Sequence, residues 1–175
     1  CHEHPNQKGW KPADNLGMAA FFSQVRFKPT GEWKEEIVYI DPDGRLTDPQ
    51  TKAVVQPKFL DGPAARIPPG ADARAVFADW LVSPQNPYFA RNIVNRVWFW
   101  LLGRGIVHEP DDMRPSNPPS NPELLDYLAG ELVAARFDLR HIYRIILNSR
   151  TYQRAGTVVP GDDADANFAR YVPRR

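Results

Sequence analysis

The chain has 175 residues, of which 42% are hydrophobic and 25% charged, and these values are typical of globular proteins rather than disordered ones. This length allows one domain with a sizeable core, or one domain with a subdomain. The net charge of +1 argues against nucleic acid or an anionic membrane as the main partner. No apolar run reaches the ~18 residues that a membrane-spanning helix needs, so no transmembrane segment is expected.

The first third of the chain mixes helical and β-type patterns. Residues 12–27 have apolar positions at helical spacing, with Asp14 as the expected N-cap, and Pro29 and Gly31 should end this helix. Residues 35–60 contain two short β-type runs, "IVYI" and "AVV", separated by Asp-Pro turn sequences. They predict a small antiparallel hairpin or meander made from these two runs.

The rest of the chain is predicted to be helical. Residues 61–72 are rich in proline and glycine and mark the best internal boundary. Four helices are expected after it, each with a capping residue at its start: 72–83 (Asp72), 86–105 (Asn86), 120–135 (Ser120, with Glu123 as a capping box) and 138–152 (Asp138). A long proline-rich loop over residues 106–120 should fold over them.

These patterns predict a mainly α fold of four to five packed helices with a small inserted antiparallel β hairpin or meander. The expected organisation has four parts. They are a motif-like segment (1–11), a helix with a β linker (12–62), a helical domain (63–154) and a loose tail (155–175). The helices between residues 72 and 152 are expected to pack as one unit.

The first two residues, Cys1 and His2, match the last two letters of the C-x-x-C-H motif that attaches c-type haem. The first cysteine of such a motif would lie upstream of residue 1. Three other interpretations remain open: a chance terminus, a lipoprotein processed at Cys1, or a C-H-x-H zinc set that includes His4. A zinc site would need further ligands, and His108 and His141 are the other histidines.

Two long stretches resemble a known family. "CHEHPNQKGWKPADNLGMAAFFSQV" (1–25), and the helical sequence from "DWLVSPQNPYFARNIVNRVWFW" to "LRHIYRIILNSRTYQ" (79–153), resemble planctomycete-type secreted cytochrome c-like proteins. In that family a haem segment and one domain of unknown function precede a second domain of unknown function, which this chain is similar to. One departure is "NQKG" after Pro5, where the family usually has an aromatic residue.

The resemblance implies a cofactor, a location and partners. Haem c would be attached through Cys1 in the full-length parent, with His2 as axial ligand and His4 as a further candidate metal ligand. The fragment alone would bind no cofactor. The parent would be secreted or periplasmic, and the partners would be the upstream domain of the same polypeptide and an electron-transfer protein. The chain would then begin on Cys-His because it is cut inside the haem motif.

A second candidate site is polar and lies in the helical half. Asn92, Asn95 and Arg96 fall at i, i+3 and i+4 on one helix face, and the proline-rich loop that follows offers Asp111, Asp112 and Arg114. Three interpretations stay open for this face. It forms an internal hydrogen-bond network with the loop, a substrate or propionate site, or a docking face for the upstream domain.

Three functions follow from these patterns. The chain is the C-terminal module of a secreted haem-linked protein that supports electron transfer or a redox enzyme, or it is a non-catalytic scaffold. The third hypothesis is a hydrolase with its site near Asn95, Arg96 and Asp111. A hydrolase predicts a deep polar pocket there, whereas a scaffold predicts an exposed apolar patch.

Overall fold

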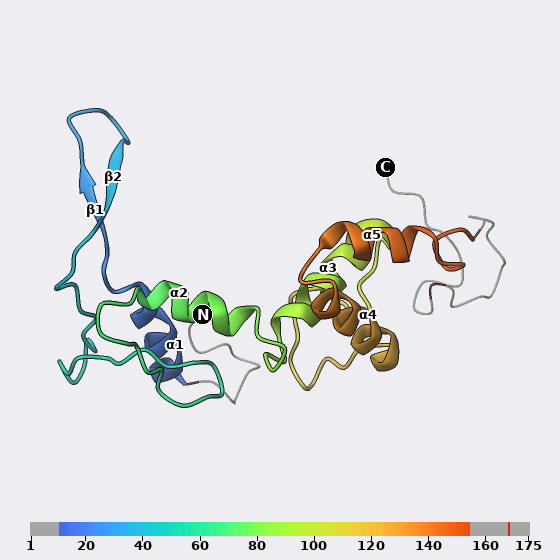
Figure 1. The fold of residues 1–175 in the computed structure, drawn as a ribbon, viewed down its shortest axis with the longest axis horizontal. Coiled ribbons are helices and arrows are strands. Elements are labelled where there is room, and N and C mark those ends of the chain that lie inside the picture. The colour runs from blue at the N-terminus through green and yellow to red at the C-terminus, as the bar shows by residue number, and fades with distance from the viewer. Residues whose placement is uncertain (1–10, 155–167, 169–175) are drawn as a thin grey trace. The chain divides into compact units, whose positions relative to one another are not determined.

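The computed structural model describes residues 11–154 and residue 168 of the chain (Figure 1). Contacts divide the chain into two compact units, with the boundary between Leu81 and Val82. The described residues form five α-helices, one short 3-10 helix and one two-stranded sheet. This confirms the expected mainly α fold with a small β hairpin. No helix among these residues has the length and apolar character needed to cross a bilayer.

The first unit begins with α1 (Pro12–Ala19) and the 3-10 helix η1 (Ala20–Phe22). Asp14 lies inside the first turn rather than at the N-cap, and its Oδ2 accepts from the Lys11 backbone N–H at 2.9 Å. The Lys58 ammonium donates to Asp14 Oδ1 at 2.8 Å, and this bond, with the one from Lys11, lowers the pKa of the Asp14 carboxyl. The predicted N-cap was therefore wrong by three residues, because Lys11 holds that position.

The predicted helix ends early because the chain after Phe22 forms a strand. β1 (Val25–Pro29) pairs antiparallel with β2 (Glu36–Ile40), with Val25 opposite Ile40 and Phe27 opposite Val38. The prediction that the second β-run would supply the partner strand was wrong, because Val54 makes only an isolated bridge with Thr47. The alternation of apolar and basic residues in β1 has the two-residue period of a strand, which outweighs the helical pattern.

Helix α2 (Ala73–Leu81) completes the first unit. Asp72 starts it as expected, with Oδ1 accepting from the Arg74 N–H at 2.9 Å. The Phe77 ring lies 5.3 Å from that of Phe21, which is 2% exposed, and Phe21 also stacks on Phe59 at 5.2 Å. The expectation that all helices from residue 72 onward pack as one unit is therefore not met, because these aromatic contacts place α2 in the first unit.

The second unit packs three helices around one apolar core: α3 (Phe89–Leu102), α4 (Pro122–Ala134) and α5 (Leu139–Leu147). Its most buried side chains come from all three helices and the loop after α3: Val94, Val97, Ile106, Val107, Leu128, Leu132, Ile142 and Ile146. Phe168 adds an edge-to-face contact with Trp98 at 5.2 Å between ring centroids. The rest of the expected tail lies outside the described residues.

The capping residues of these helices agree in part with those predicted from the sequence. Asn86 Oδ1 accepts from the Tyr88 and Phe89 N–H groups, so it holds the start of α3, although the helix begins at Phe89. Asp138 caps α5 as expected, but α4 is capped by Asn121 rather than Ser120. Gly103 ends α3 in the left-handed region at φ 89°, a conformation that glycine adopts without steric cost.

The division into two units predicts where a core mutation acts. Phe21→Ala should remove about 3 kcal/mol or more from the first unit, because it empties the centre of the aromatic cluster. Native-state hydrogen exchange should show faster exchange in α1 and α2 and unchanged exchange in α3 to α5. Leu132→Ala is the matched control and should show the reverse pattern. Equal loss of protection in both units in either variant would contradict the division.

Candidate functional site

Asn95 of α3 is fully buried and bonded on both ends of its amide. Its Nδ2 donates to the carbonyls of Val107 and Pro110, both at 3.0 Å, and its Oδ1 accepts from the Val107 N–H at 2.9 Å. The side chain thus pairs with Val107 as a backbone segment in a sheet would. All of its hydrogen-bonding groups serve to hold the loop that follows the helix.

Gly105 makes this close approach sterically feasible. A Cβ at this position would lie 2.2 Å from the Val107 carbonyl oxygen and 3.1 Å from both amide atoms of Asn95. Any side chain there would displace the carbonyl that Asn95 binds. The Gly-Arg-Gly sequence after α3 therefore provides one glycine to end the helix and a second for the Asn95 contact.

We call residues 106–120 the proline strap. Its two ends are joined, because the Ser120 N–H and Oγ both donate to the Ile106 carbonyl, at 2.8 and 3.0 Å. Inside it, Asn117 Nδ2 donates to the carbonyls of His108 and Asp112, at 2.6 and 2.9 Å. The sequence pattern predicts a capping role for Ser120 and gives no role to Asn117. Two prolines follow Asn117 in the sequence, and this combination, which is typical of turns, could have indicated its role.

The charged residues of the candidate site form two separate pairs. Arg96 binds Asp111 through two contacts, Nε to Oδ1 at 2.7 Å and Nη2 to Oδ2 at 2.5 Å, and both side chains are exposed. Arg114 binds Asp112 in the same two-pronged way, and this bond raises the pKa of the Arg114 guanidinium above its usual value. Both carboxylates are thus neutralised by an arginine.

The remaining predicted site residues lie elsewhere. Asn92 is half-buried in α3, and no hydrogen bond among the described residues joins its side chain to Asn95 or to the strap. His141 of α5 bonds to Glu131 of α4 at 2.8 Å, and His108 lies 3.7 Å from Glu109. Cys1, His2 and His4 lie outside the described residues. Within residues 11–154, no three histidine, cysteine or acidic side chains cluster as metal ligands would.

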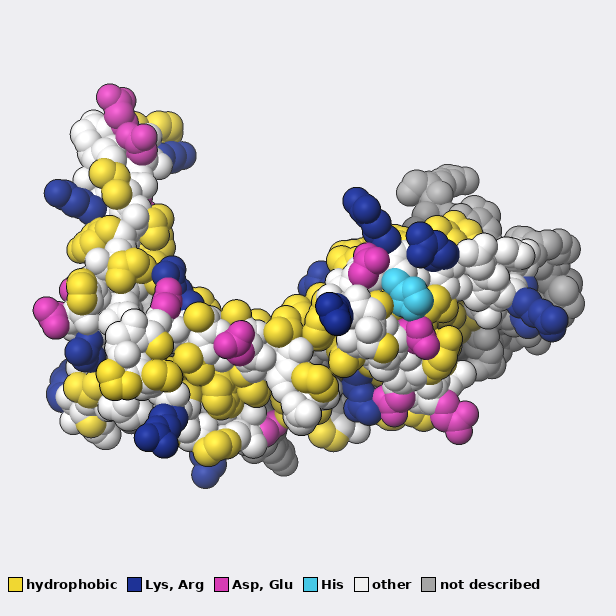
Figure 2. All heavy atoms as spheres, in the orientation of Figure 1, with side chains coloured by type: hydrophobic (Ala, Val, Ile, Leu, Met, Phe, Trp, Pro, Cys, Tyr) yellow, Lys and Arg dark blue, Asp and Glu magenta, His cyan; other side chains and the backbone are white. Residues whose placement is uncertain are grey.

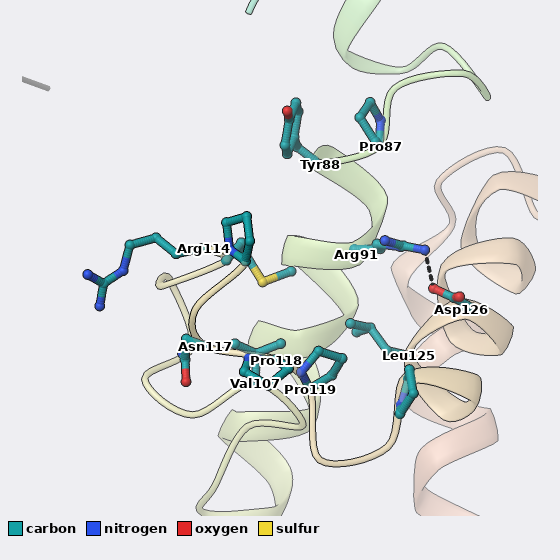
Figure 3. Close-up of a pocket in the computed structure, with 13 residues that line it drawn as sticks. Pro87, Tyr88, Arg91, Val107, Arg114, Asn117, Pro118, Pro119, Leu125 and Asp126 are labelled. Atoms are coloured by element: carbon teal, nitrogen blue, oxygen red, sulfur yellow. Dashed lines mark ion pairs between the residues drawn. The ribbon is translucent and has the colours of Figure 1, made fainter. Parts of the chain in front are cut away.

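A pocket of about 310 Å³ lies beside the proline strap, in the second unit (Figure 3). It does not include Asn95, Arg96 or Asp111, so it is not the deep polar pocket that a hydrolase at those residues predicts. Five of its thirteen lining residues are prolines, from the strap, the turn before α3 and the start of α4: Pro87, Pro115, Pro118, Pro119 and Pro122. Arg91 of α3 and Asp126 of α4 form an ion pair at its edge, at 2.5 Å.

The fold and site define a small helical domain with a proline loop fixed by a buried asparagine. The chain belongs to a family described as "Protein of unknown function (DUF1553)", whose model matches residues 73–175, more than half of the chain. The match begins at α2 and includes the strap and Phe168. No curated protein matches the chain significantly, and neither does any solved structure.

Two neighbouring residues of α3 should differ sharply in their effect on stability. Asn95→Leu keeps the branched side-chain shape but removes the partner of the Val107 N–H and of two carbonyls, at a cost of about 3 kcal/mol or more. Arg96→Gln removes only an exposed ion pair and should cost less than about 1 kcal/mol. Urea unfolding followed by Trp fluorescence gives both values. Similar losses for the two variants would show that Asn95 does not hold the strap as described.

Proposed function

We propose that this chain is the C-terminal module of a secreted or periplasmic haem-linked protein, and that the module itself is a non-catalytic scaffold. The β hairpin is the observation that supports it most. All five residues of β2 are exposed, and four of them are apolar. Figure 2 shows hydrophobic side chains along the outside of the hairpin.

Both faces of β2 are apolar. One face of the hairpin carries only apolar side chains at its centre, with Phe27 62% and Val38 60% exposed. The other face places Ile37 and Tyr39 of β2 beside Lys28 and Arg26 of β1. A strand that is apolar on both faces is typical of a strand covered on both sides. The hairpin therefore has the composition of a buried element and the exposure of an uncovered one.

The partner that we assign to the hairpin is the domain that precedes this chain in the same polypeptide. A two-stranded hairpin by itself is at best marginally stable in water, so packing against a neighbour would stabilise it. The resemblance places a haem segment and another domain immediately upstream, and the hairpin follows shortly after the Cys-His segment. An upstream domain is thus the surface available at the highest local concentration.

The polar candidate site favours scaffolding over hydrolysis. General acid–base catalysis needs carboxyl groups that face a substrate and exchange protons near neutral pH. Asp111 and Asp112 are each held by an arginine, and the Asn95 amide is saturated by the strap. These residues stabilise a loop, and none is left to activate water.

The haem part of the proposal is supported by Cys1-His2 and by the resemblance of the segment that follows. In the full-length protein, matured where cytochrome c is assembled, a pyridine haemochrome spectrum and the mass of the denatured protein should show covalent haem. Cys1→Ala should weaken the attachment, and His2→Ala should remove the axial ligand and change the spectrum. His141→Ala is the control, because His141 bonds to Glu131 and should leave haem unchanged. A folded full-length protein without haem would contradict this part.

The docking part has its own test. In the full-length protein, backbone amides of β1 and β2 should exchange more slowly than in this chain alone, because an upstream domain covers the hairpin. Phe27→Ser together with Val38→Thr should abolish that extra protection without unfolding the module, since both side chains are exposed. Tyr127→Ser, at an exposed position of α4, is the control. Equal hairpin exchange in the long and short proteins would refute docking while leaving the haem test unaffected.

A further inference from the structure

The pocket beside the proline strap has the size and wall composition of a small-molecule site. Its volume of about 310 Å³ is at the lower end of the range usual for ligand pockets. Besides its prolines, the wall contains the apolar side chains of Met113 and Leu125 and the ring of Tyr88. Figure 3 shows Pro118 and Pro119 of the strap close to Val107, with Leu125 and Asp126 of α4 to their right.

The pocket is preformed. Proline fixes its own φ angle, so a wall of prolines loses little conformational freedom when a ligand binds. The strap that carries three of these prolines is tied at its two ends by Ser120, inside by Asn117 and to α3 by Asn95. The hydrogen bonds of Asn95, Asn117 and Ser120 therefore hold this wall of the pocket in place.

Arg91 holds its aspartate less fully than Arg74, Arg96 and Arg114 hold theirs. Arg96 and Arg114 each use both Nε and Nη2 to hold a carboxylate, as does Arg74 in the first unit. Arg91 approaches Asp126 through Nη2, 2.5 Å from Oδ1, and no pair of Nε and Nη2 hydrogen bonds joins these two side chains in the described residues. An arginine has five N–H donors in a planar fork, so most of those on Arg91 remain for an acceptor in the pocket.

We propose that this pocket binds a small organic acid with an apolar body, such as an aromatic or short aliphatic carboxylate. The apolar body lies against the prolines and Leu125, and the carboxylate takes the N–H donors of Arg91 that Asp126 leaves unused. A carboxylate fits the guanidinium fork in a two-pronged geometry that Asp126 does not complete. This site is independent of the haem and docking functions proposed above.

The test is an ¹H–¹⁵N NMR titration of this chain with three probes. Phenylacetate has both the ring and the charge, 2-phenylethanol has the ring alone, and acetate has the charge alone. Phenylacetate should shift the amides of Arg91, Asn117 and Leu125 and bind more tightly than either of the other two. Absence of these shifts, or equal binding of phenylacetate and 2-phenylethanol, would overturn the proposal.

Two variants of the ion pair should act in opposite directions. Arg91→Gln should weaken phenylacetate binding about tenfold, which corresponds to the loss of a charge-assisted hydrogen bond. Asp126→Asn should tighten it, because the competing and repelling carboxylate is gone. Arg140→Gln, at an exposed arginine of α5 outside the pocket, is the control and should change nothing. The same effect from Arg91→Gln and Asp126→Asn would indicate only a structural role for the pair and would refute the assignment.

Discussion

The described part of the second unit depends on one buried side chain, the amide of Asn95. A fully buried polar side chain destabilises the fold unless its donors and acceptor are hydrogen-bonded. Here the backbone of the proline strap supplies the partners. The strap contains many prolines, which lack an N–H and cannot form a regular ladder of their own. A side chain from α3 therefore performs the pairing that secondary structure would otherwise provide. This pairing needs a glycine at position 105, because a side chain there would collide with the Val107 carbonyl that Asn95 binds.

Fixing the strap has consequences beyond stability. The strap closes on itself through Ile106 and Ser120, and its prolines form one wall of a pocket whose other walls are the starts of α3 and α4. A loop of this length without such anchors would fluctuate, and the pocket would exist only part of the time. Of the polar residues singled out in the sequence, Asn95 therefore holds this strap to α3. The residue that offers unused hydrogen-bond donors, Arg91, lies four positions before Asn95 on the same helix.

The two units use apolar residues in different ways. In the second unit they are buried where α3, α4 and α5 meet, as the helical spacing predicts. In the first unit an aromatic cluster around Phe21 and Phe77 is buried, while the hairpin exposes its apolar side chains. A sheet of two strands has no third layer to cover it, so its composition makes sense only with a neighbour. This contrast is why the hairpin, rather than the polar site, carries the proposed function.

The sequence by itself determined the mainly α fold, the four helices that follow residue 72 and the caps at Asp72 and Asp138, because helical periodicity and capping are local. For the face with Asn95 it left three interpretations open: a network with the loop, a ligand site or a docking face. Only the tertiary structure decided that choice, since it depends on which carbonyls lie within reach of the amide. Strand pairing was decided in the same way: β1 and "AVV" are both β-type sequences, and the partner of β2 is selected by turn geometry and packing. The membership of α2 in the first unit likewise rests on aromatic contacts between residues far apart in the chain.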